Sequence, residues 1–491
     1  MKASTAYTLI GMYCTACLSF CHADDLFDRS VVEIIATVQN IDPIMPWRRE
    51  APGVQTGFGV VVAPGRVITT EDLIRNATMV ELRRPRTGTK ILSHIILADH
   101  QAGLALLSCP PGSNDIAQLP LATSVPTNTS LSVVQFDANA AIQSDQGRLI
   151  EYAVGLLPES PSPTLMFKVL ANLNTGERGA PVFNGGELAG LVIRADRSSQ
   201  TFLALPYTAI RRFLQQAAEP KYTGIASAGF GWKALTDPVR RNFYAITNYE
   251  GGIEVTRTFP NTGAFEVLMP GDVIMRWDGQ TIDSQGYYND TEFGRLILPH
   301  LISGRRRPGD TVRIDLIRQG RARTVTIKLT RHADDDSLIP DNILRSQPEY
   351  IVECGMIFRE LGGDYLRAFG NKWILQANPR LIHLYLNQTQ NPQNAGHRYV
   401  ILVGVLPDEI NIGYQHLRDM VVTAVNHKPI DNLGDIARIM ATDGGISHLS
   451  LQGFGQDIVL DIPQRTDANR RIARSYRIPS LQYLRAAQSI Q

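Results

Sequence analysis

Three short segments in the first half of the chain place a charged residue or a glycine beside a turn-like sequence. Asp72 follows an apolar run and two threonines, Gly103 precedes a Leu-Ala-Leu-Leu run, and Arg178 lies in the sequence Gly-Glu-Arg-Gly-Ala-Pro. An Asp carboxylate is a weak base, with an ordinary pKa of about 3.9, and glycine has no side chain. An arginine guanidinium stays protonated and cannot attack a carbonyl carbon. These positions provide two opposite charges but neither a nucleophile nor an effective base.

The nearest residues that could replace the missing groups are His94, His100 and Thr175. A serine-type reaction needs a hydroxyl, a base that takes its proton, and a third group that orients the base. We interpret His94 and His100 as surface histidines and Thr175 as a turn residue. An active site built from these residues is the alternative interpretation.

The elements that must position these turns are short and rich in β-structure. Between residues 31 and 217, apolar or alternating runs recur between Gly, Pro and Asn residues, which indicates an antiparallel barrel or sandwich. Strands are expected at 31–38, 57–62, 79–82, 91–97, 104–107, 131–135, 166–169, 188–193 and 202–205. One helix is expected over 207–216, because its apolar residues fall on one side.

Two further units follow a linker at residues 219–221, and they share a layout of strands, one helix and closing strands. The first is expected to hold strands at 253–256, 273–277, 312–317 and 324–329, and a helix over 291–302 that Pro299 should kink or shorten. The second is expected to hold strands at 356–358, 399–405, 420–425 and 458–462, and a helix at 433–440. A long insertion, residues 364–397, separates its early strands.

Length and composition bound the class of protein. A chain of 491 residues is too long for one core and suggests three domains. The net charge of +1 gives no electrostatic reason to expect nucleic acid as a partner. Only Cys109 and Cys354 lie outside the first 23 residues, so a disulfide framework is not expected. No Cys/His spacing suggests a metal site, and no cofactor is expected.

The first residues read as a signal peptide. Lys2 is followed by an uncharged, mostly apolar stretch that ends at Ala23, before two acidic residues. This pattern predicts cleavage after Ala23 and a secreted or periplasmic protein. A lipoprotein anchored through Cys21 is the alternative. No other stretch reaches the roughly 18 apolar residues that a membrane span needs.

Four segments resemble, in order and spacing, the motifs of trypsin-like proteases of the HtrA/Deg family. They are Gly57–Val61, Gly65–Ile74, Gly103–Leu107 and Asn174–Asn184, and the last is the most specific. The Pro-Trp-Arg sequence at 46–48 is similar to the plant-type Deg branch. The resemblance implies a mainly β protein, a trypsin-like double β-barrel followed by two PDZ-like α+β domains. The implied domains are a signal peptide (1–23), a protease-fold domain (24–220), a first PDZ domain (224–332), a divergent PDZ-like domain (339–464) and a tail (465–491).

The resemblance assigns Asp72 to the position of the general base, Gly103 to that of the orienting aspartate, and Arg178 to that of the nucleophile. A member of the family with these residues is expected to be inactive, because triad residues act as a unit. Base and nucleophile side chains face each other in this fold, so we predict an ion pair between Asp72 and Arg178. The alternative is that Arg178 points to solvent and Asp72 caps the following helical turn.

The PDZ-like units imply peptide binding. Residues 270–282 of the first unit resemble the Gly-Asp-Val-Ile turn of PDZ domains in proteases. Its expected carboxylate-binding loop is Ala228, Gly229, Phe230, Gly231 and Trp232, although Phe230 and Trp232 could be core residues. A peptide C-terminus would add as a strand beside this loop. In the second unit residues 353–358 are the corresponding loop, but we favour a structural or oligomer-building role there.

The predicted function is that of a non-catalytic pseudoprotease that binds peptide C-termini or partner proteins, including active Deg/HtrA relatives, in a chaperone-like or regulatory role. A homo-oligomer is expected. One alternative is an active serine endopeptidase of protein quality control that uses non-standard residues. The other is a purely structural oligomer scaffold.

Overall fold

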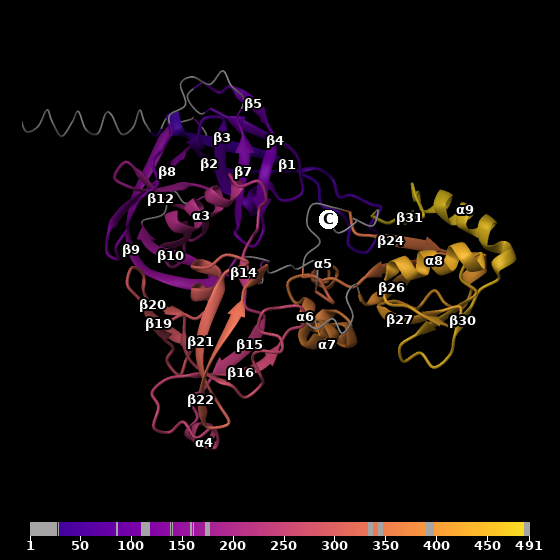
Figure 1. The fold of residues 1–491 in the computed structure, drawn as a ribbon. Helices are drawn as coiled ribbons and strands as arrows, with labels where there is room; N and C mark the ends of the chain where they lie inside the picture. Colours follow the sequence, from indigo (N-terminus) through magenta and orange to yellow (C-terminus); the bar gives the residue numbers. More distant parts are fainter. Residues whose placement is uncertain are drawn as a thin grey trace, which may run out of the picture. The chain divides into compact units, whose positions relative to one another are not determined.

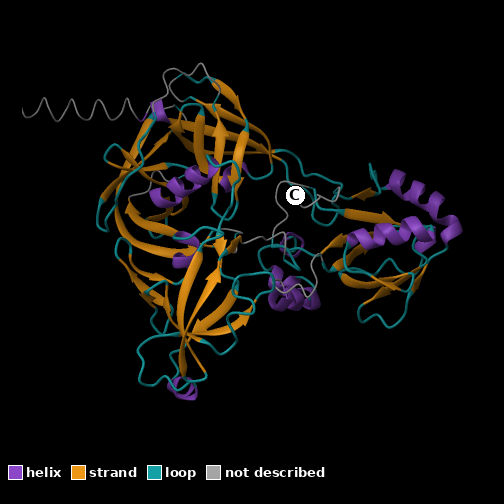
Figure 2. Ribbon diagram, in the orientation of Figure 1, coloured by secondary structure: helices purple, strands orange, loops and turns teal. Residues whose placement is uncertain are grey.

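The computed structural model describes residues 27, 29–84, 87–109, 118–137, 139, 141–157, 160, 162–171, 177–331, 337–341, 347–388 and 397–485 (Figure 1). The predicted signal peptide and Thr175 lie outside the described residues. The chain forms two compact units. The first contains Met1–Val38 and Pro52–His332, and the second contains Gln39–Ala51 and Ala333–Gln491. Strands make up most of the first unit (Figure 2).

The first half of the protease-fold domain is a seven-stranded antiparallel sheet in the order β5-β4-β1-β2-β3-β7-β6. Its strands are β1 (Val31–Val38), β2 (Gly53–Ala63), β3 (Arg66–Thr70), β4 (Ala77–Arg83), β5 (Lys90–Ser93), β6 (Ile95–Asp99) and β7 (Leu104–Ser108). A one-turn helix, α2 (Glu71–Ile74), follows β3 directly. The sheet buries alternate residues of β1, as expected for a strand with one face on a core.

The second half is a closed six-stranded barrel in the order β10-β13-β12-β11-β8-β9. Its strands are β8 (Ser130–Phe136), β9 (Ile142–Leu156), β10 (Pro163–Ala171), β11 (Pro181–Asn184), β12 (Glu187–Asp196) and β13 (Thr201–Pro206), and helix α3 (Tyr207–Ala217) follows. The predicted trypsin-like fold is confirmed. Sequence patterns missed β9, the longest strand of the barrel, because polar residues occupy most of its first half.

The first PDZ domain holds the sheet β15-β16-β17-β21-β22, and β18 pairs with β17. Its elements are β14 (Ala226–Ser227), β15 (Phe230–Ala234), α4 (Pro238–Phe243), β16 (Ile253–Thr258), β17 (Val273–Trp277), β18 (Gln280–Thr281), β19 (Tyr287–Asp290), β20 (Gly294–Ile297), the π-helix η1 (His300–Gly304), β21 (Thr311–Arg318), β22 (Arg321–Lys328) and β23 (Thr330–Arg331). The four strands predicted from sequence in this domain are confirmed as β16, β17, β21 and β22.

The helix predicted over 291–302 is wrong. The hairpin of β19 and β20 occupies most of this segment, and only η1 is helical. The Asp290 carboxylate accepts hydrogen bonds from the Glu292 and Phe293 amides, at 2.9 and 3.2 Å. These bonds, together with Gly294 at a φ of +76°, turn the chain back on itself before a helix can begin.

The C-terminal unit is built on the sheet β30-β29-β27-β26-β25-β24-β31, with β28 paired to β27. Its strands are β24 (Tyr350–Glu353), β25 (Met356–Glu360), β26 (Val400–Val405), β27 (Met420–Val425), β28 (Lys428–Pro429), β29 (His448–Leu451), β30 (Ile458–Val459) and β31 (Gln482–Tyr483). Its helices are α5 (Gly363–Arg367), α6 (Trp373–Gln376), α7 (Pro379–Gln388), η3 (Glu409–Asn411), α8 (Leu433–Asp443), η4 (Ile462–Gln464) and α9 (Arg465–Ser475).

This unit has two apolar cores. One lies under α8, and the other gathers residues of α5, α7 and α9 around Tyr350 and Ile401. The insertion at 364–397 therefore builds a second core onto a PDZ-like sheet. Residues after Pro463 also belong to this packing, since Ile472 and Ile478 are buried in it.

Candidate functional site

Asp72 and Arg178 lie on two turns that backbone contacts hold in place. Asp72 lies in the first turn of α2, whose N-cap residue is Thr70. The turn that carries Arg178 is fixed to β2 and β12, because Phe58 N–H donates to the Arg178 carbonyl at 2.9 Å and Gly179 N–H donates to the Val192 carbonyl at 2.8 Å. Gly179 has a φ of +75°, and a Cβ atom there would lie 2.0 Å from the Phe58 carbonyl oxygen. Only glycine fits this turn.

The two side chains form the predicted ion pair. Arg178 Nη1 lies 3.3 Å from Asp72 Oδ2, and the two residues are 106 positions apart in the chain. The Arg178 side chain is 43% exposed and that of Asp72 is 22% exposed. The pair is therefore in contact with water, and a pair of this kind contributes at most about 1 kcal/mol to stability. The alternative, in which Asp72 caps the helical turn, is wrong.

Gly103 occupies the third position of the motif. Its φ is +68°, and a Cβ atom built on it would lie 2.6 Å from Leu157 Cδ1. Its carbonyl accepts a hydrogen bond from the Glu71 amide at 3.0 Å, which ties this turn to the start of α2. The structure thus brings all three motif positions together, and it leaves no room at residue 103 for a side chain without rearrangement.

The prediction that His100 is a surface histidine is wrong. The residue is 7% exposed, and its Nδ1 lies 3.2 Å from Glu71 Oε2 and 3.0 Å from Arg75 Nη2. The Asp99 carboxylate accepts hydrogen bonds from Gln101 and Ala102 amides, and this turn directs the imidazole inward. His94 is exposed, as predicted.

Glu71 is the charged residue that sequence reasoning missed beside Asp72. It is 1% exposed. Burial raises the pKa of the Glu71 carboxyl, but the hydrogen bond with His100 and the positive charge of Arg75 outweigh burial and lower it to about 2. The spacing of Glu71 and Arg75, four residues apart on α2, is the only signal in the sequence that could have indicated this cluster.

Close contacts constrain the backbone of the predicted peptide-binding loop in the first PDZ domain. Gly229 has a φ of +79°, and a Cβ atom there would lie 2.0 Å from Thr262 Oγ1. Its carbonyl accepts from the Phe259 amide at 2.9 Å, and the neighbouring Ala228 carbonyl accepts from the Ala264 amide at 3.1 Å.

Phe230 and Trp232 are half-buried and pack against the apolar core, as core residues would, and their part in peptide binding stays a prediction. The Phe230 ring stacks on that of Trp277 with centroids 5.8 Å apart, and the indole of Trp232 lies against Gly286.

The two PDZ-like sheets differ at the edge where a peptide would add. Among the described strands, β15 is the end of its sheet and pairs only with β16. In the C-terminal unit the equivalent strand β25, which follows the loop at Gly355, pairs with β24, and β24 pairs with β31. Cys354 N–H also donates to Asn469 Oδ1 at 2.7 Å. The chain itself therefore fills the corresponding edge of the C-terminal unit.

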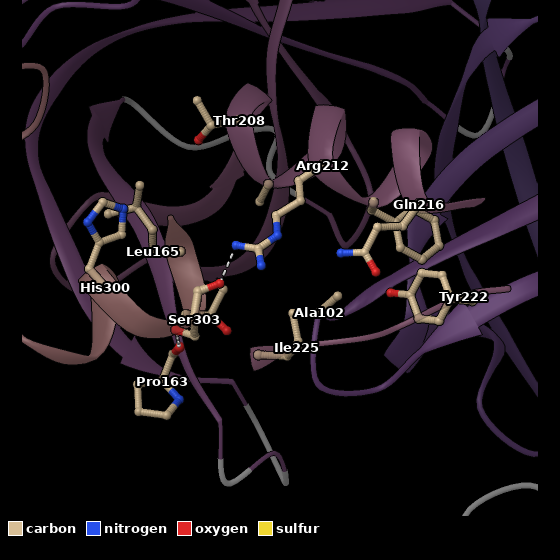
Figure 3. A pocket seen from close by; sticks show the side chains of 14 residues that line it. Ala102, Pro163, Leu165, Thr208, Arg212, Gln216, Tyr222, Ile225, His300 and Ser303 are labelled. Atoms are coloured by element: carbon tan, nitrogen blue, oxygen red, sulfur yellow. Dashed lines mark hydrogen bonds between the residues drawn. The ribbon is translucent and has the colours of Figure 1, made fainter. Parts of the chain in front are cut away.

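A cavity of about 60 Å³ lies where α3, β10 and η1 meet, between the barrel and the first PDZ domain (Figure 3). Arg212 extends from α3 into it and donates to the carbonyls of Ser303 and Arg306. Nearby, the Tyr152 and Phe293 rings pack with centroids 4.7 Å apart. One apolar cluster continues from the barrel into the PDZ domain, so this cavity is a packing junction within a single compact unit.

Other kinds of site are not indicated. Within the described ranges, no group of three or more His, Cys, Asp or Glu side chains could hold a metal ion. None of the helices in the described part of the chain is long and apolar enough to cross a membrane.

Comparison with known proteins gives consistent similarities. A PDZ domain model matches residues 339–482. The chain is 26% identical over 432 residues to "Protease Do-like 2, chloroplastic" of Arabidopsis thaliana, which covers 85% of this chain and 68% of that protein. It is 25% identical over 308 residues to "Probable periplasmic serine endoprotease DegP-like" of Hahella chejuensis, which covers 60% and 61%. The structure of an HtrA-type protease, AlgW, with a tripeptide superposes with a TM-score of 0.50 at 18% identity, over 63% of this chain and 96% of that one.

The strand order, the three turns gathered at Asp72, and the PDZ sheets define a trypsin-like protease fold joined to PDZ domains. The HtrA-type structure shares this fold over the part of the chain that it covers. In sequence and fold, the chain is similar to the HtrA/Deg family of trypsin-like proteases with PDZ domains.

His300 at the junction predicts a pH dependence of stability. It is 3% exposed, and burial lowers its pKa to about 4, although the Asp290 charge opposes this shift. Between pH 6.5 and 4 the unfolded chain binds a proton that the folded chain does not, so stability falls as the pH is lowered. We expect a loss of up to about 3 kcal/mol, measured by urea unfolding of the purified protein between pH 7 and 4.

The His300→Gln variant should show a clearly smaller slope between about pH 6.5 and 5, where His300 dominates, and His94→Gln, at an exposed position, should keep the wild-type slope. An unchanged slope in His300→Gln would contradict the assignment.

Proposed function

We propose that this protein is a non-catalytic, extracytoplasmic member of the HtrA/Deg family that binds protein chains through its first PDZ domain, in a chaperone-like or regulatory role. The observation that carries the proposal is the ion pair of Asp72 and Arg178, with a separation of 3.3 Å. These residues stand where the family motif requires a base and a nucleophile.

The chemistry supports loss of hydrolysis. Covalent catalysis on a peptide bond needs a hydroxyl or thiol at the nucleophile position, and Arg178 supplies a cation that cannot lose its proton. The base at Asp72 would need a third group at residue 103 to orient it, and glycine stands there. The ion pair also holds both charged groups against each other and away from a substrate carbonyl.

The alternative of an active peptidase with non-standard residues requires a different base. His100 is the nearest histidine, but it is buried and its Nδ1 contacts Glu71 and Arg75. A base in this position would have to leave a carboxylate and a guanidinium to reach a nucleophile. The contacts of His100 therefore favour a structural role for this imidazole.

The first PDZ domain is the proposed working surface. Strand β15 ends its sheet among the described strands, and a peptide can add to such an edge through backbone hydrogen bonds. Gly229, just before β15, has a positive φ, and a left-handed residue in such a loop can turn neighbouring amides toward a carboxylate. We propose ligands with free C-termini, including partner proteins of the same family.

A structural role is proposed for the C-terminal unit. Its corresponding edge is filled by β24 and β31, which favours a domain that packs within the chain or with other copies in a homo-oligomer. A position outside the cytoplasm follows from the signal-like first 23 residues and from similarity to proteins named periplasmic.

Substitution of the nucleophile position tests the catalytic part of the proposal. Arg178→Ser restores a hydroxyl while Asp72 and Gly103 remain, and we expect no hydrolysis of unfolded casein above the level of the matched Arg178→Ala protein. The reason is that no effective base is present at Asp72. Hydrolysis by Arg178→Ser and not by Arg178→Ala would show that another base is in place and would favour the peptidase alternative.

A pair of glycine substitutions tests the peptide-binding part. Gly229→Ala should weaken binding of peptides with free C-termini by at least about tenfold, because the added Cβ atom meets Thr262 and the turn must move. Gly279→Ala is the matched control, since Gly279 also has a positive φ of 81° but a Cβ atom there meets nothing within 4 Å.

The measurement is fluorescence polarisation with a C-terminal peptide library, with thermal unfolding recorded for both variants. Equal peptide affinity of the Gly229→Ala and wild-type proteins would show that the peptide-binding site lies elsewhere. Absence of any bound peptide would refute the peptide-binding function itself.

A further inference from the structure

The loop between β1 and β2 forms a self-ordered finger, residues Gln39–Ala51, which belongs to the compact C-terminal unit. Two backbone hydrogen bonds close its base and its middle: Glu50 N–H to the Asn40 carbonyl at 2.9 Å and Asp42 N–H to the Arg48 carbonyl at 3.0 Å. At the tip, the Asp42 carboxylate accepts from the amides of residues 44 and 45, at 2.8 and 3.0 Å. The finger therefore has a fixed shape set by its own residues.

The C-terminal unit receives this finger through a fully buried arginine. Arg359 is 0% exposed, and its Nη1 donates to the Pro43 carbonyl at 2.6 Å. Its other donors bind within the unit: Nε to the Glu360 carbonyl at 3.1 Å and Nη2 to the Asp364 carboxylate at 2.8 Å. Without the finger, Arg359 Nη1 would lose its hydrogen-bond acceptor, the Pro43 carbonyl. An unpaired donor of a buried cation costs free energy, because no water replaces the lost partner.

A second polar contact and one aromatic side chain complete the docking. Gln347 Nε2 donates to the Pro46 carbonyl at 2.9 Å. Trp47 is 9% exposed and lies in the second apolar core, with its ring centroid 5.6 Å from that of Tyr350. A buried tryptophan and a buried arginine that both hold one segment have the composition of a hot spot in protein–protein recognition.

These contacts resemble those between a protein and a bound peptide. The finger is held by hydrogen bonds between its own residues, so it loses little conformational entropy on docking, and the unit binds it through two proline carbonyls and the tryptophan that follows them. We propose that the C-terminal unit contains a peptide-binding site for a proline–tryptophan turn, and that the chain's own finger occupies it as an intramolecular ligand. A turn of the same chemistry from another source, such as the finger of a second copy of this chain, can bind there once the finger withdraws. This site is distinct from the proposed groove at β15.

The barrel itself allows a clean test, because Val38 and Gly53 are paired across β1 and β2 at the base of the finger. Replacing residues 39–52 by Asn-Gly closes this hairpin with a two-residue turn and removes the finger from the full chain. The probe is a synthetic peptide of residues 39–51, labelled at one end and measured by fluorescence polarisation. The expected result is saturable binding to the finger-less protein and binding at least about tenfold weaker to the wild-type protein.

The matched control is in the peptide, where no folding problem arises. The Trp47→Ala peptide should bind the finger-less protein at least about tenfold more weakly than the native peptide. If the C-terminal unit of the finger-less protein is unfolded by circular dichroism, restoration of its signal by the native peptide and not by the Trp47→Ala peptide supports the same conclusion. Failure of the native peptide to bind or to restore the signal, or equal behaviour of the two peptides, would overturn the proposal.

Discussion

Two opposite charges, Asp72 and Arg178, meet where the chain turns after β3 and before β11. The constraint that brings them together is the protease fold itself: β2 lies between these turns and holds the second one through the Phe58–Arg178 hydrogen bond. Asp72 lies in the first turn of α2, where the helix amides favour a carboxylate, and it also pairs with the Arg178 guanidinium. The pair thus fits the electrostatics of the scaffold without a change in the strands that carry it.

Two glycines shape the turns at the motif positions. Gly179 turns the chain into β11 and Gly103 lies in the turn before β7, both with a positive φ. At residue 103, Leu157 occupies the volume that a side chain would need. Beside Asp72, the side chains of Glu71, His100 and Arg75 form a polar cluster that holds the start of α2.

The two PDZ-like sheets differ at their edge strands, and we assign them different roles for this reason. In the first, β15 ends the sheet, and the domain packs on the barrel through the β19–β20 hairpin and η1. In the C-terminal unit, β24 and β31 fill the corresponding edge, and the insertion at 364–397 adds a second core that receives the finger. An available edge favours exchange of ligands, and a filled edge favours a fixed assembly. The proposal assigns binding of chain ends to the first sheet and docking of the finger to the second unit.

Much of the fold was predictable, because strand periodicity and turn residues are local signals. The ranges of β1, β17 and β27, the three motif positions and the ion pair all followed from short segments and their order. The helix over 291–302 was wrong because the Asp290 carboxylate binds the next amides and starts a turn, a competition that periodicity does not show. The burial of His100 and the docking of Trp47 depend on partners 29 and about 300 residues away in the chain, and no local pattern indicates such contacts.

The central claim is that the pair of Asp72 and Arg178 replaces a catalytic base and nucleophile with groups that cannot form an acyl-enzyme. Treatment of the purified protein with a fluorophosphonate probe, followed by gel fluorescence and mass spectrometry, tests it most directly. The account predicts no covalent adduct under conditions in which an active serine protease is fully labelled. A stoichiometric adduct on a residue of the barrel would contradict it.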